Sequence, residues 1–599
     1  MIARLSYGTI AALHMCFLVL CISRSLAADR IHYSVTLENP EQHLVQVRID
    51  IPPGRNEREL QLPVWNALYQ VRDFSQYMNW IRAEDTNGKP LPVVELNKSR
   101  WRVSGVQNGA RVHYELFADD AGPFGAQLNP HHAFFNLAEL LCYIEGERAD
   151  RDEIEFRNIP AGWNIATPLQ VEGSDFAATS YDQMVDSPVE ISAFSEKDLV
   201  VNGARYRVVV DASNAQAVLD KIVPAIQRIV TTETGWMNDR PFQTYTFIYH
   251  LSDSAGGGME HSYGTAITMP QKYISEDFER FEGTTAHEFF HLWNVKRIRP
   301  QSLEPIDYTK ENYTPALWFS EGVDSTVSGY VQLRAGMLDE RSYLRHLSQE
   351  ITELENRPAH LTQSAEQSSI DCWLEKYLYY NLPSRSVSYY NKGELLGVLL
   401  DLKMREASND RVSLQDLFRW MNAHYAKRGK LFSDSEGIRE AAESLAHADF
   451  RDFFAKYVSG VEEIPWNDFL SRVGLRVTKA DVTISDPGFQ AARIFDQPLT
   501  VLQVEHGSGA ERAGLKSGDV IVEINGQRGS REAEQALAGI APGASIHVKV
   551  ERSGVERELQ WAPSSRKQEV FRLDDTPEVN ELQKSRRKSW LFGSTAENP

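Results

Sequence analysis

The sequence predicts a multidomain α+β protein in which a β-rich region, a mainly helical region and a second β-rich region follow one another. Three observations predict this order. Apolar residues alternate with polar ones up to about residue 118, recur at helical spacing from about residue 218 to 458, and form short runs between glycine turns from about residue 474. With 599 residues, the chain has room for about three or four domains, each with its own core.

The N-terminal region, residues 28–202, is expected to form an antiparallel β domain. Apolar residues alternate with polar ones at Val45, Val47, Ile49 and Ile51. Turn signals such as Asn87-Gly88 separate such runs. This pattern is typical of strands with one face in a core and the other in solvent.

The period changes in the next region, residues 203–465. A run of apolar residues recurs at helical spacing, namely Val218, Leu219, Ile222, Ile226 and Ile229. Pro224 lies inside this run, and we expect it to kink or break the helix. Further helical patterns follow, so we interpret the region as one domain that is mixed α/β at first and then α.

Residues 466–563 are predicted to form a third, smaller domain. Expected strands lie at Thr500–Val504, Val520–Ile524 and Ser545–Val550. Residues 511–526 match the A-G-L-x-x-G-D-x-I-x-x-I-N-G signature of bacterial PDZ domains. Such domains bind extended peptide ends or protein ligands by adding a strand to a sheet edge, although a module that only packs against its neighbour fits the signature equally well. The tail, residues 564–599, lacks apolar periodicity, and we expect it to be loosely ordered.

The composition is that of an ordinary globular protein, and the charge disfavours some classes of partner. Hydrophobic residues make up 42% of the chain and charged residues 24%, so large cores can form. The formal net charge of -20 argues against nucleic acid and anionic membrane surfaces as main partners. We therefore expect peptides or small molecules as ligands, and no nucleic acid.

Residues 1–27 have the pattern of a secretory signal peptide. Arg4 supplies a positive charge, an apolar run covers residues 10–22, and Ser25-Leu26-Ala27 has the form of a signal-peptidase site. The run is interrupted by His14, and no later segment offers about 20 consecutive apolar residues. We expect cleavage after Ala27, export to the periplasm or secretion, and no stable membrane insertion.

Cleavage at that site would leave two cysteines, Cys142 and Cys372. In an oxidising compartment they could form a single disulfide. Two separate buried thiols fit the sequence equally well, because the geometry that decides pairing cannot be obtained from sequence.

The segment from His287 to His291 has the HExxH pattern. On a helix, two histidines four residues apart point from one face and can bind one metal ion, while Glu288 lies beside them and can take a proton from the attacking water. In a chain of this length the pattern should arise by chance on the order of a few times in a hundred. Two hydrogen-bonded histidines on a core helix are therefore the weaker alternative.

Catalytic zinc normally takes three protein ligands, so a third must be found. Glu321 lies within the aromatic sequence Trp318-Phe319-Ser320-Glu321-Gly322, where a buried unpaired carboxylate would be costly unless it met a metal or a cation. His261 is the main rival, but it lacks a partner at metal-binding spacing. Asp324 could orient a ligand histidine from outside the ligand set, or it could lie on a solvated helix face.

A glycine-rich segment upstream could bind substrate. The apolar strand Tyr245–Tyr249 leads into Gly256-Gly257-Gly258-Met259-Glu260-His261. Gly257 and Gly258 would let the backbone edge approach a bound peptide closely, and Glu260 could bind an α-ammonium group. Taken alone, a glycine run after a strand is more often only a loop.

A tyrosine pair downstream could act in the transition state. Tyr389 and Tyr390 precede Asn391-Lys392-Gly393 at the start of an apolar helix. A tyrosine hydroxyl there could donate a hydrogen bond to the oxyanion that develops on the scissile carbonyl. An isolated tyrosine pair is usually packing, so the pattern alone does not choose between the two roles.

Four signatures occur in a fixed order, and together they carry a family resemblance: GGGMEH, HEFFHLWNVKRIRP, LWFSEG and SYYNKG, followed by the PDZ-like segment. In this combination the chain resembles the glycyl aminopeptidase family of gluzincin metallopeptidases over nearly the whole length after residue 27. The resemblance implies a thermolysin-like catalytic domain with bound zinc. It implies zinc ligands His287, His291 and Glu321, general base Glu288, amine binding at Glu260 and oxyanion stabilisation by Tyr390.

The resemblance also implies hydrolysis of the first peptide bond of peptides with a small N-terminal residue. The sequence departs from the expected pattern at Val323-Asp324, where an aromatic residue and a threonine are expected after Glu321-Gly322. Two alternatives remain open. One is a thermolysin-like endopeptidase in which Glu260 meets no amine, and the other is a non-catalytic periplasmic scaffold whose PDZ domain binds the partner.

Overall fold

The computed structural model describes residues 30–66, 69–253, 255–492, 498–528, 533, 536–537, 539–541 and 543–593. The expected signal peptide, residues 1–27, lies outside the described residues. The described chain divides into two compact units. The N-terminal unit comprises residues 30–64, 73–120 and 125–193, and the C-terminal unit comprises residues 65–72, 121–124 and 194–593.

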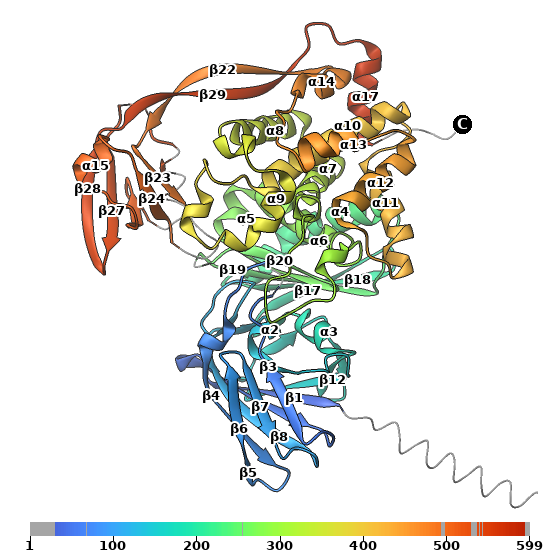
Figure 1. Cartoon of the computed structure of the whole chain (residues 1–599), viewed down its shortest axis with the longest axis vertical. Helices are drawn as coiled ribbons and strands as arrows, with labels where there is room; N and C mark the ends of the chain where they lie inside the picture. Colours follow the sequence, from blue (N-terminus) through green and yellow to red (C-terminus); the bar gives the residue numbers. More distant parts are fainter. Residues whose placement is uncertain are drawn as a thin grey trace, which may run out of the picture. The chain divides into compact units, whose positions relative to one another are not determined.

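The N-terminal unit consists mainly of β-sheet (Figure 1), which confirms the predicted β domain. Its eight-stranded sheet has the order β14-β15-β12-β1-β2-β8-β4-β5, with strands Gln170–Glu172, Asp175–Ala178, Asp152–Arg157, Ile31–Asn39, Leu44–Ile51, Ala110–Phe117, Met78–Asp85 and Pro90–Leu91. Two four-stranded sheets have the orders β13-β16-β10-β9 (Asn164–Ala166, Val189–Ser192, His132–Phe135, Ala126–Leu128) and β11-β3-β7-β6 (Tyr143–Ile144, Glu57–Gln61, Arg100–Ser104, Val93–Asn97). Two short helices are α2 Leu137–Leu140 and α3 Tyr181–Val185.

The alternation seen in the sequence sets the faces of these strands. In β2, every second residue is buried, beginning with Val45, because side chains of a strand point alternately to opposite faces. The pairings in the eight-stranded sheet are antiparallel except for β1 with β12, which run parallel. The expected antiparallel domain is therefore mixed at this one pair.

The C-terminal unit begins with a five-stranded sheet whose order is β17-β18-β19-β21-β20. These strands are Ser195–Val201, Ala204–Asp211, Thr244–Leu251, Gly264–Met269 and Gly257–His261. The long helix α4, Ala215–Met237, connects the parallel strands β18 and β19. It continues through Pro224, so the predicted break at that residue is wrong. Strand β20, which carries the glycine-rich segment, forms the end of the sheet.

Helices gather on one side of this sheet (Figure 1). They are α5 Lys272–Glu276, α6 Phe278–Phe290, α7 Asp324–Arg334, α8 Glu340–Glu355, α9 Ala365–Ile370, α10 Tyr389–Ser408, α11 Leu414–His424, α12 Asp434–Ala446, α13 Arg451–Phe453 and α14 Trp466–Leu470. A π-helix, Trp318–Val323, precedes α7 directly. Among the described residues, no helix is long and apolar enough to cross a bilayer.

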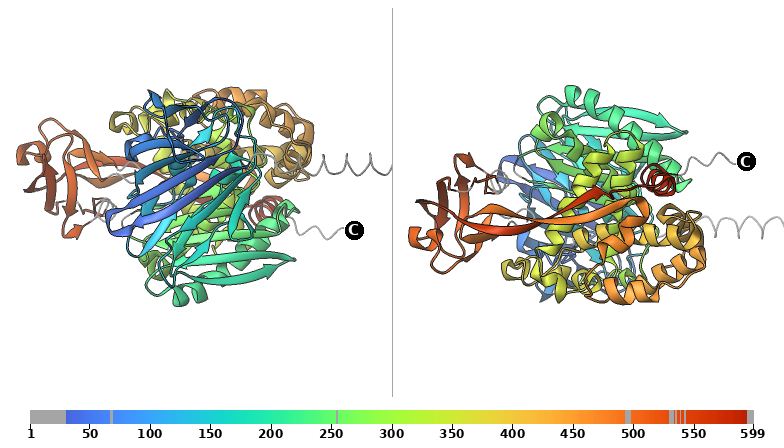
Figure 2. Two further views of the ribbon diagram at one scale, coloured as in Figure 1. Left: turned by 90° about the horizontal axis from the view of Figure 1, so that it is seen from below. Right: turned by 90° about the horizontal axis from the view of Figure 1, so that it is seen from above.

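The PDZ-like segment has its own sheet and its own core. Its elements are β23 Phe489–Ala492, β24 Thr500–Val504, α15 Gly509–Ala513, β25 Val520–Ile524, β26 Gln527–Arg528, β27 Ile546–Arg552 and β28 Val555–Trp561. A two-stranded ribbon of β22, Leu475–Asp486, and β29, Ser564–Asp575, leads to and from this module, and Figure 2 shows the two long strands side by side. Side chains of α8 pair with the outer edge of β29: the Thr352 hydroxyl accepts from Phe571 N at 2.9 Å, and the Ser348 hydroxyl accepts from Leu573 N at 3.0 Å.

The expectation of a loosely ordered tail is wrong for residues 564–593. After β29 the chain forms helix α17, Glu581–Phe592, whose Trp590 is fully buried. The indole of Trp590 donates to the hydroxyl of Tyr330 on α7 at 2.6 Å. The sequence could not reveal this, because β29 pairs with a strand about ninety residues earlier and α17 buries only a short apolar end.

Candidate active site

Helix α6 carries the HExxH segment and is fixed on the five-stranded sheet by its aromatic face. The Phe289 ring packs against Tyr206, Tyr245 and Phe247, with ring centroids 6.0, 5.0 and 5.7 Å away. His287 and Glu288 lie in the last turn of α6, and His291 caps its end. Because residues four apart lie on one face of a helix, burying Phe289 turns both histidines toward the same cavity.

The three predicted ligand atoms converge. The Nε2 atoms of His287 and His291 are 3.1 Å apart, and Glu321 Oε2 lies 3.4 and 3.3 Å from them. In a tetrahedral site with ligand bonds of about 2.0–2.2 Å, neighbouring ligand atoms are about 3.3–3.6 Å apart. The arrangement is therefore compatible with a single metal ion bound by these three side chains.

The charges in the site also suit a cation. Burial would raise the pKa of Glu321, but the charge of His291 and hydrogen bonds from both histidines hold it well below its usual value. Glu321 is therefore ionised. Three carboxylates, Glu260, Glu288 and Glu321, line the same cavity as the two histidines.

Glu321 is presented by the π-helix Trp318–Val323, a type of turn that is frequent at functional sites. The amide of Asn294, three residues after His291, donates to the carbonyls of Phe319 at 3.0 Å and Ser320 at 3.3 Å. These bonds tie the π-helix to the end of the HExxH segment. They hold the third carboxylate opposite the two imidazoles.

Gly322 allows α10 to approach this π-helix. A Cβ at Gly322 would lie 2.5 Å from Gly393 Cα and 2.5 Å from the carbonyl oxygen of Tyr389. No real side chain tolerates such contacts, so glycine is required for the two backbones to touch. The contact brings the N-terminal turn of α10, with Tyr389 and Tyr390, to the edge of the cavity.

Asp324 lies behind the two histidines and is fully buried. Its Oδ2 is 3.3 Å from His287 Nδ1, and its Oδ1 is 3.7 Å from His291 Nδ1. The Nδ1 atom of His291 also lies 2.8 Å from the carbonyl oxygen of Asn294. The alternative of a solvated helix-face aspartate is therefore wrong, and Asp324 is placed to fix the orientation of both rings.

Glu288 and the glycine-rich edge lie face to face. A Cβ at Gly258 would be 2.1 Å from Glu288 Oε1, so only glycine leaves room for the carboxylate there. Burial raises the pKa of Glu288 to about 8, although the charge of His291 opposes the shift. Glu260, two residues further along β20, is 8% exposed and lines the same cavity.

Tyr390 and Tyr389 differ in their surroundings. Tyr389 is buried, while Tyr390 is 42% exposed and its ring centroid lies 6.0 Å from that of His287. Although much of the side chain is exposed, its hydroxyl is desolvated by burial. This desolvation, followed by the charges of Glu321 and Glu288, raises the pKa of the Tyr390 phenol well above its usual value. The hydroxyl therefore keeps its proton and can donate it in a hydrogen bond.

Comparisons with known proteins agree with this geometry. The model of the Peptidase M61 N-terminal domain matches residues 32–193, that of M61 glycyl aminopeptidase matches residues 280–396, and that of a PDZ domain matches residues 500–552. The resemblance to the glycyl aminopeptidase family is confirmed. These matches support a peptidase with an appended PDZ domain.

A solved structure with the same architecture supports the match. The chain is similar to the crystal structure of an aminopeptidase N family protein from Idiomarina loihiensis, with 26% identity, a TM-score of 0.77, and coverage of 94% of this chain and 100% of the other. Yeast LTA4 hydrolase in complex with bestatin has 12% identity and a TM-score of 0.46, covering 75% and 70% of the two chains. Comparison with curated protein sequences gives no match.

The structure of this peptidase brings together all the site residues expected from the sequence, and two further residues from outside the four sequence signatures line the same cavity. Gly257, Gly258, Glu260, His287, Glu288, His291, Glu321 and Tyr390 lie in or beside one cavity. The rival ligand His261 is buried at the end of β20 and does not line it. Tyr69 and Phe124 do line it, although the chain before and after the short segments that carry them, residues 65–72 and 121–124, belongs to the N-terminal unit. No sequence signal identified them, because loops that join strands are not readable as parts of a distant site.

A second group of metal-ligating side chains lies on α8 and α10: His346, Glu350 and Glu394. His346 Nε2 is 2.7 Å from Glu394 Oε1, and the amide of Asn391 donates to Glu350 Oε2 at 2.7 Å. Although burial lowers it, the pKa of His346 is raised to about 9 by the hydrogen bond to Glu394 and by its charge. A protonated His346 therefore already pairs with the Glu394 carboxylate, and the group joins two helices.

The two remaining cysteines do not form a bridge. Cys142 and Cys372 are both buried free thiols. Burial raises the pKa of the Cys142 thiol to about 12, so it stays protonated and unreactive.

Proposed function

We propose that the protein is a zinc-dependent aminopeptidase of the gluzincin type that hydrolyses the first peptide bond of peptides with a small N-terminal residue, Gly or Ala. The observation that carries the proposal is the convergence of two Nε2 atoms and one carboxylate within 3.4 Å, with Glu288 and Glu260 beside them. The ligand set of two histidines and one glutamate is one that catalytic zinc uses in hydrolases.

His287, His291 and Glu321 would hold the ion. When bound, zinc would polarise the scissile carbonyl and lower the pKa of a water molecule. Asp324 and the Asn294 carbonyl hold the imidazole rings in the orientation that points both Nε2 atoms at the ion.

Glu288 acts as the general base and then as the acid. Its carboxylate takes a proton from the attacking water and delivers it to the nitrogen of the leaving amine. The close contact with Gly258 places the carboxylate directly against the backbone edge along which a peptide would lie. Tyr390 donates its hydroxyl hydrogen to the oxygen that becomes negatively charged at the scissile carbonyl.

Glu260 makes the enzyme an exopeptidase in this proposal. A peptide that pairs with the edge strand β20 would bring its α-ammonium group to Glu260, with the first peptide bond beside Glu288. An endopeptidase would need the cavity to continue past Glu260. The cavity that Glu260 lines has a volume of about 40 Å³, which supports a small first residue.

The remaining parts of the proposal concern location, domains and partners. We expect the chain to be exported and to act in the periplasm or outside the cell, with residues 28–202, 203–465 and 466–563 as its three domains. The PDZ-like module would bind a peptide or protein ligand by strand addition at a sheet edge. Neither the location nor this ligand is needed for the chemistry of the site.

The decisive experiment compares peptides with a free amine and the same peptides after N-acetylation. Acetylation removes the charge that Glu260 would bind and leaves the carboxylate desolvated, so acetylated glycyl and alanyl peptides should be poor substrates. Glu260→Ala should lower kcat/KM on free peptides by on the order of 10²–10³-fold but should add almost no loss on acetylated ones, because the partner is already absent.

Metal analysis completes this test. The purified chain should carry about one zinc ion and lose hydrolysis with a chelator, and Glu288→Gln should keep the metal but lose turnover. Rapid cleavage of blocked or internal bonds by the native chain would instead establish the endopeptidase. Absence of both metal and hydrolysis would establish the scaffold.

A further inference from the structure

Two short segments enter the C-terminal unit from between strands of the N-terminal unit, and both reach the cavity. They are residues 65–72, of which 65–66 and 69–72 are described, and Ala121–Phe124. The indole of Trp65 donates to the carbonyl of Asp307 at 2.7 Å, and its ring meets that of Trp373 edge-on at 5.2 Å. The segment that carries Tyr69 is thus anchored on the helical part of the unit.

Tyr69 is held in an unusual backbone conformation inside this anchored segment. Its φ is 56°, in the left-handed region that bulky residues rarely adopt. The ring is 7% exposed and packs against Trp65 and Trp373, with both centroids 6.4 Å away. Such strain persists only where surrounding contacts impose it, and it is concentrated at ligand sites.

Tyr69 lines the cavity together with Glu321 and Glu260. Burial, followed by the charges of Glu321 and Glu260, raises the pKa of its phenol well above the usual value. Tyr69 therefore stands close to both the third ligand carboxylate and the carboxylate assigned to the amine. Between these two groups lies the position of the first residue of a substrate.

Phe124 occupies the other end of the edge strand. A Cβ at Gly257 would lie 2.8 Å from its ring, whereas Gly258 abuts Glu288 and Glu260 follows two residues later on the same face of β20. A peptide with its amine at Glu260 therefore has its first residue near Tyr69. Its second residue lies beyond the scissile bond, near Gly257 and Phe124.

We propose that Tyr69 is the residue that restricts the first residue of the substrate to a small side chain, and that Phe124 faces the second residue. The inference rests on the proposed aminopeptidase function, since it takes the amine to lie at Glu260. The cavity of about 40 Å³ leaves room for a few water-sized groups. The Tyr69 ring closes the space into which a longer first side chain would extend.

The test is Tyr69→Gly, which removes the ring and suits the backbone, because glycine adopts positive φ without strain. For dipeptide amides with Gly, Ala, Leu or Phe first, the ratio of kcat/KM for Leu to that for Gly should rise by about tenfold or more. Tyr69→Asn, which also tolerates this conformation, should raise the ratio in the same direction.

Two control variants localise the effect. Asn202→Gly makes the same kind of backbone change in the turn between β17 and β18, where φ is 50°, and should leave the Leu to Gly ratio unchanged. Phe124→Ala should change the preference for the second residue and leave the preference for the first unchanged. An unchanged ratio in folded Tyr69→Gly or Tyr69→Asn would overturn the assignment.

The outcome separates this inference from the function on which it rests. If the native chain hydrolyses no free glycyl or alanyl peptide, the aminopeptidase proposal itself fails. If it hydrolyses them and folded Tyr69→Gly gains nothing on Leu or Phe, only the role of Tyr69 fails.

Discussion

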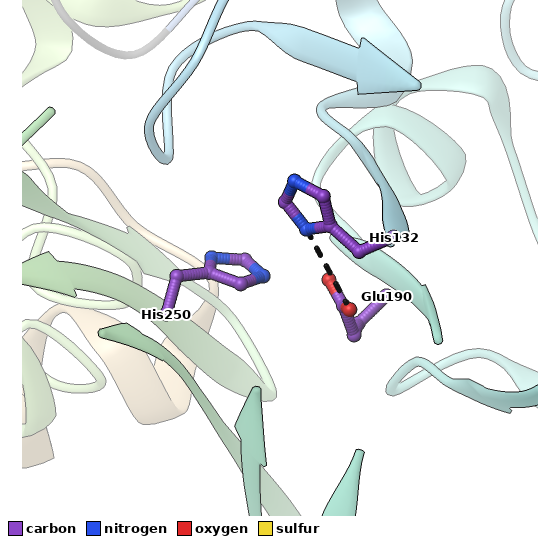
Figure 3. Close-up of side chains that lie close together, drawn as sticks. All are labelled: His132, Glu190 and His250. Atoms are coloured by element: carbon purple, nitrogen blue, oxygen red, sulfur yellow. Dashed lines mark ion pairs between the residues drawn. The ribbon is translucent and has the colours of Figure 1, made fainter. Parts of the chain in front are cut away.

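Each unit contains a buried glutamate beside a histidine, and the two groups differ in geometry. In the N-terminal unit, Glu190 on β16 is fully buried and lies 3.9 Å from His132 Nδ1 on β10 (Figure 3). In the C-terminal unit, Glu321 lies 3.4 and 3.3 Å from the Nε2 atoms of two histidines. Only the group in the C-terminal unit brings ligand atoms of three side chains from the same unit within 3.4 Å of one another.

The backbone explains the difference. Residues i and i+4 of a helix lie above one another, so HExxH delivers two imidazoles to one place. Alternate residues of a strand share a face but are separated by about 6.6 Å along it, so one strand rarely offers two ligands to one ion. A buried glutamate near one histidine is therefore not enough for the proposed metal site, which also needs the helical spacing that brings a second imidazole to the same carboxylate.

A third buried carboxylate extends the comparison. Asp152 on β12 is 1% exposed, and burial, with the charges of Asp150 and Asp182, raises its pKa to about 8. Burial would also raise the pKa of Glu321. There, the charge of His291 and the hydrogen bonds from both histidines lower the pKa below its usual value instead. Asp152 and Glu321 thus differ in the sign of the pKa shift, because only Glu321 accepts hydrogen bonds from two histidines.

The largest expected effect comes from removing the third ligand. Glu321→Gln should lower zinc content and reduce kcat/KM by about 10³-fold or more, because the charge stabilisation that the metal supplies is worth several kcal/mol. Metal analysis and peptide hydrolysis check this. Glu190→Gln is the matched control in the N-terminal unit and should keep one zinc per chain. If both variants lost zinc equally, Glu321 would not differ from Glu190 in its role in metal binding.

A smaller effect is expected at the neighbouring tyrosines. Tyr390→Phe should lower kcat by roughly 10²-fold with little change in KM, because the hydroxyl acts mainly in the transition state. Tyr389→Phe should have a far smaller effect, since that ring is 3% exposed and packs against the Tyr390 ring, with the two centroids 4.8 Å apart. Steady-state kinetics of the two variants decide the choice, and the reverse order would assign the donor to Tyr389.

Local patterns predicted much of this arrangement. The alternation in β2, the helix of the HExxH segment and the PDZ signature each depend on residues close in sequence, and all three were found as expected. The contribution of Asp324 was left open, because a sequence does not show whether a helix face is buried. Its burial follows from the packing of α7 against α6, which places Asp324 next to His287 and His291.

Features that depend on contacts between distant segments were missed. Tyr69 reaches the cavity because Trp65 is anchored by Asp307 and Trp373, more than two hundred residues away. Strand β29 and helix α17 are ordered by β22 and by Tyr330, neither of which is near them in sequence. Pro224 does not break α4 for a different reason, since the packing of the helix outweighs the loss of one backbone hydrogen bond.

The smallest expected effect concerns the stability of the N-terminal unit and its dependence on pH. Neither carboxylate oxygen of Asp152 has a hydrogen-bond partner among the described residues. The folded chain binds the proton of Asp152 up to a pKa of about 8, whereas the unfolded chain releases it near its usual value of about 3.9. Between these values the folded state binds more protons, so stability falls as the pH rises and the full penalty is present above pH 8.

Asp152→Asn should remove that penalty. The variant should be more stable than the native chain at pH 8 by ~1–3 kcal/mol, and the difference should shrink toward pH 4, where the aspartate is neutral in both states. Calorimetry of the full-length chain at pH 4 and pH 8 measures this difference in stability from the transition that includes the N-terminal unit. Glu95→Gln, at an exposed position, is the control. A variant that is less stable at pH 8 would mean that Asp152 is ionised and paired in the folded chain. The sign of the pKa shift would then no longer separate Asp152 from Glu321.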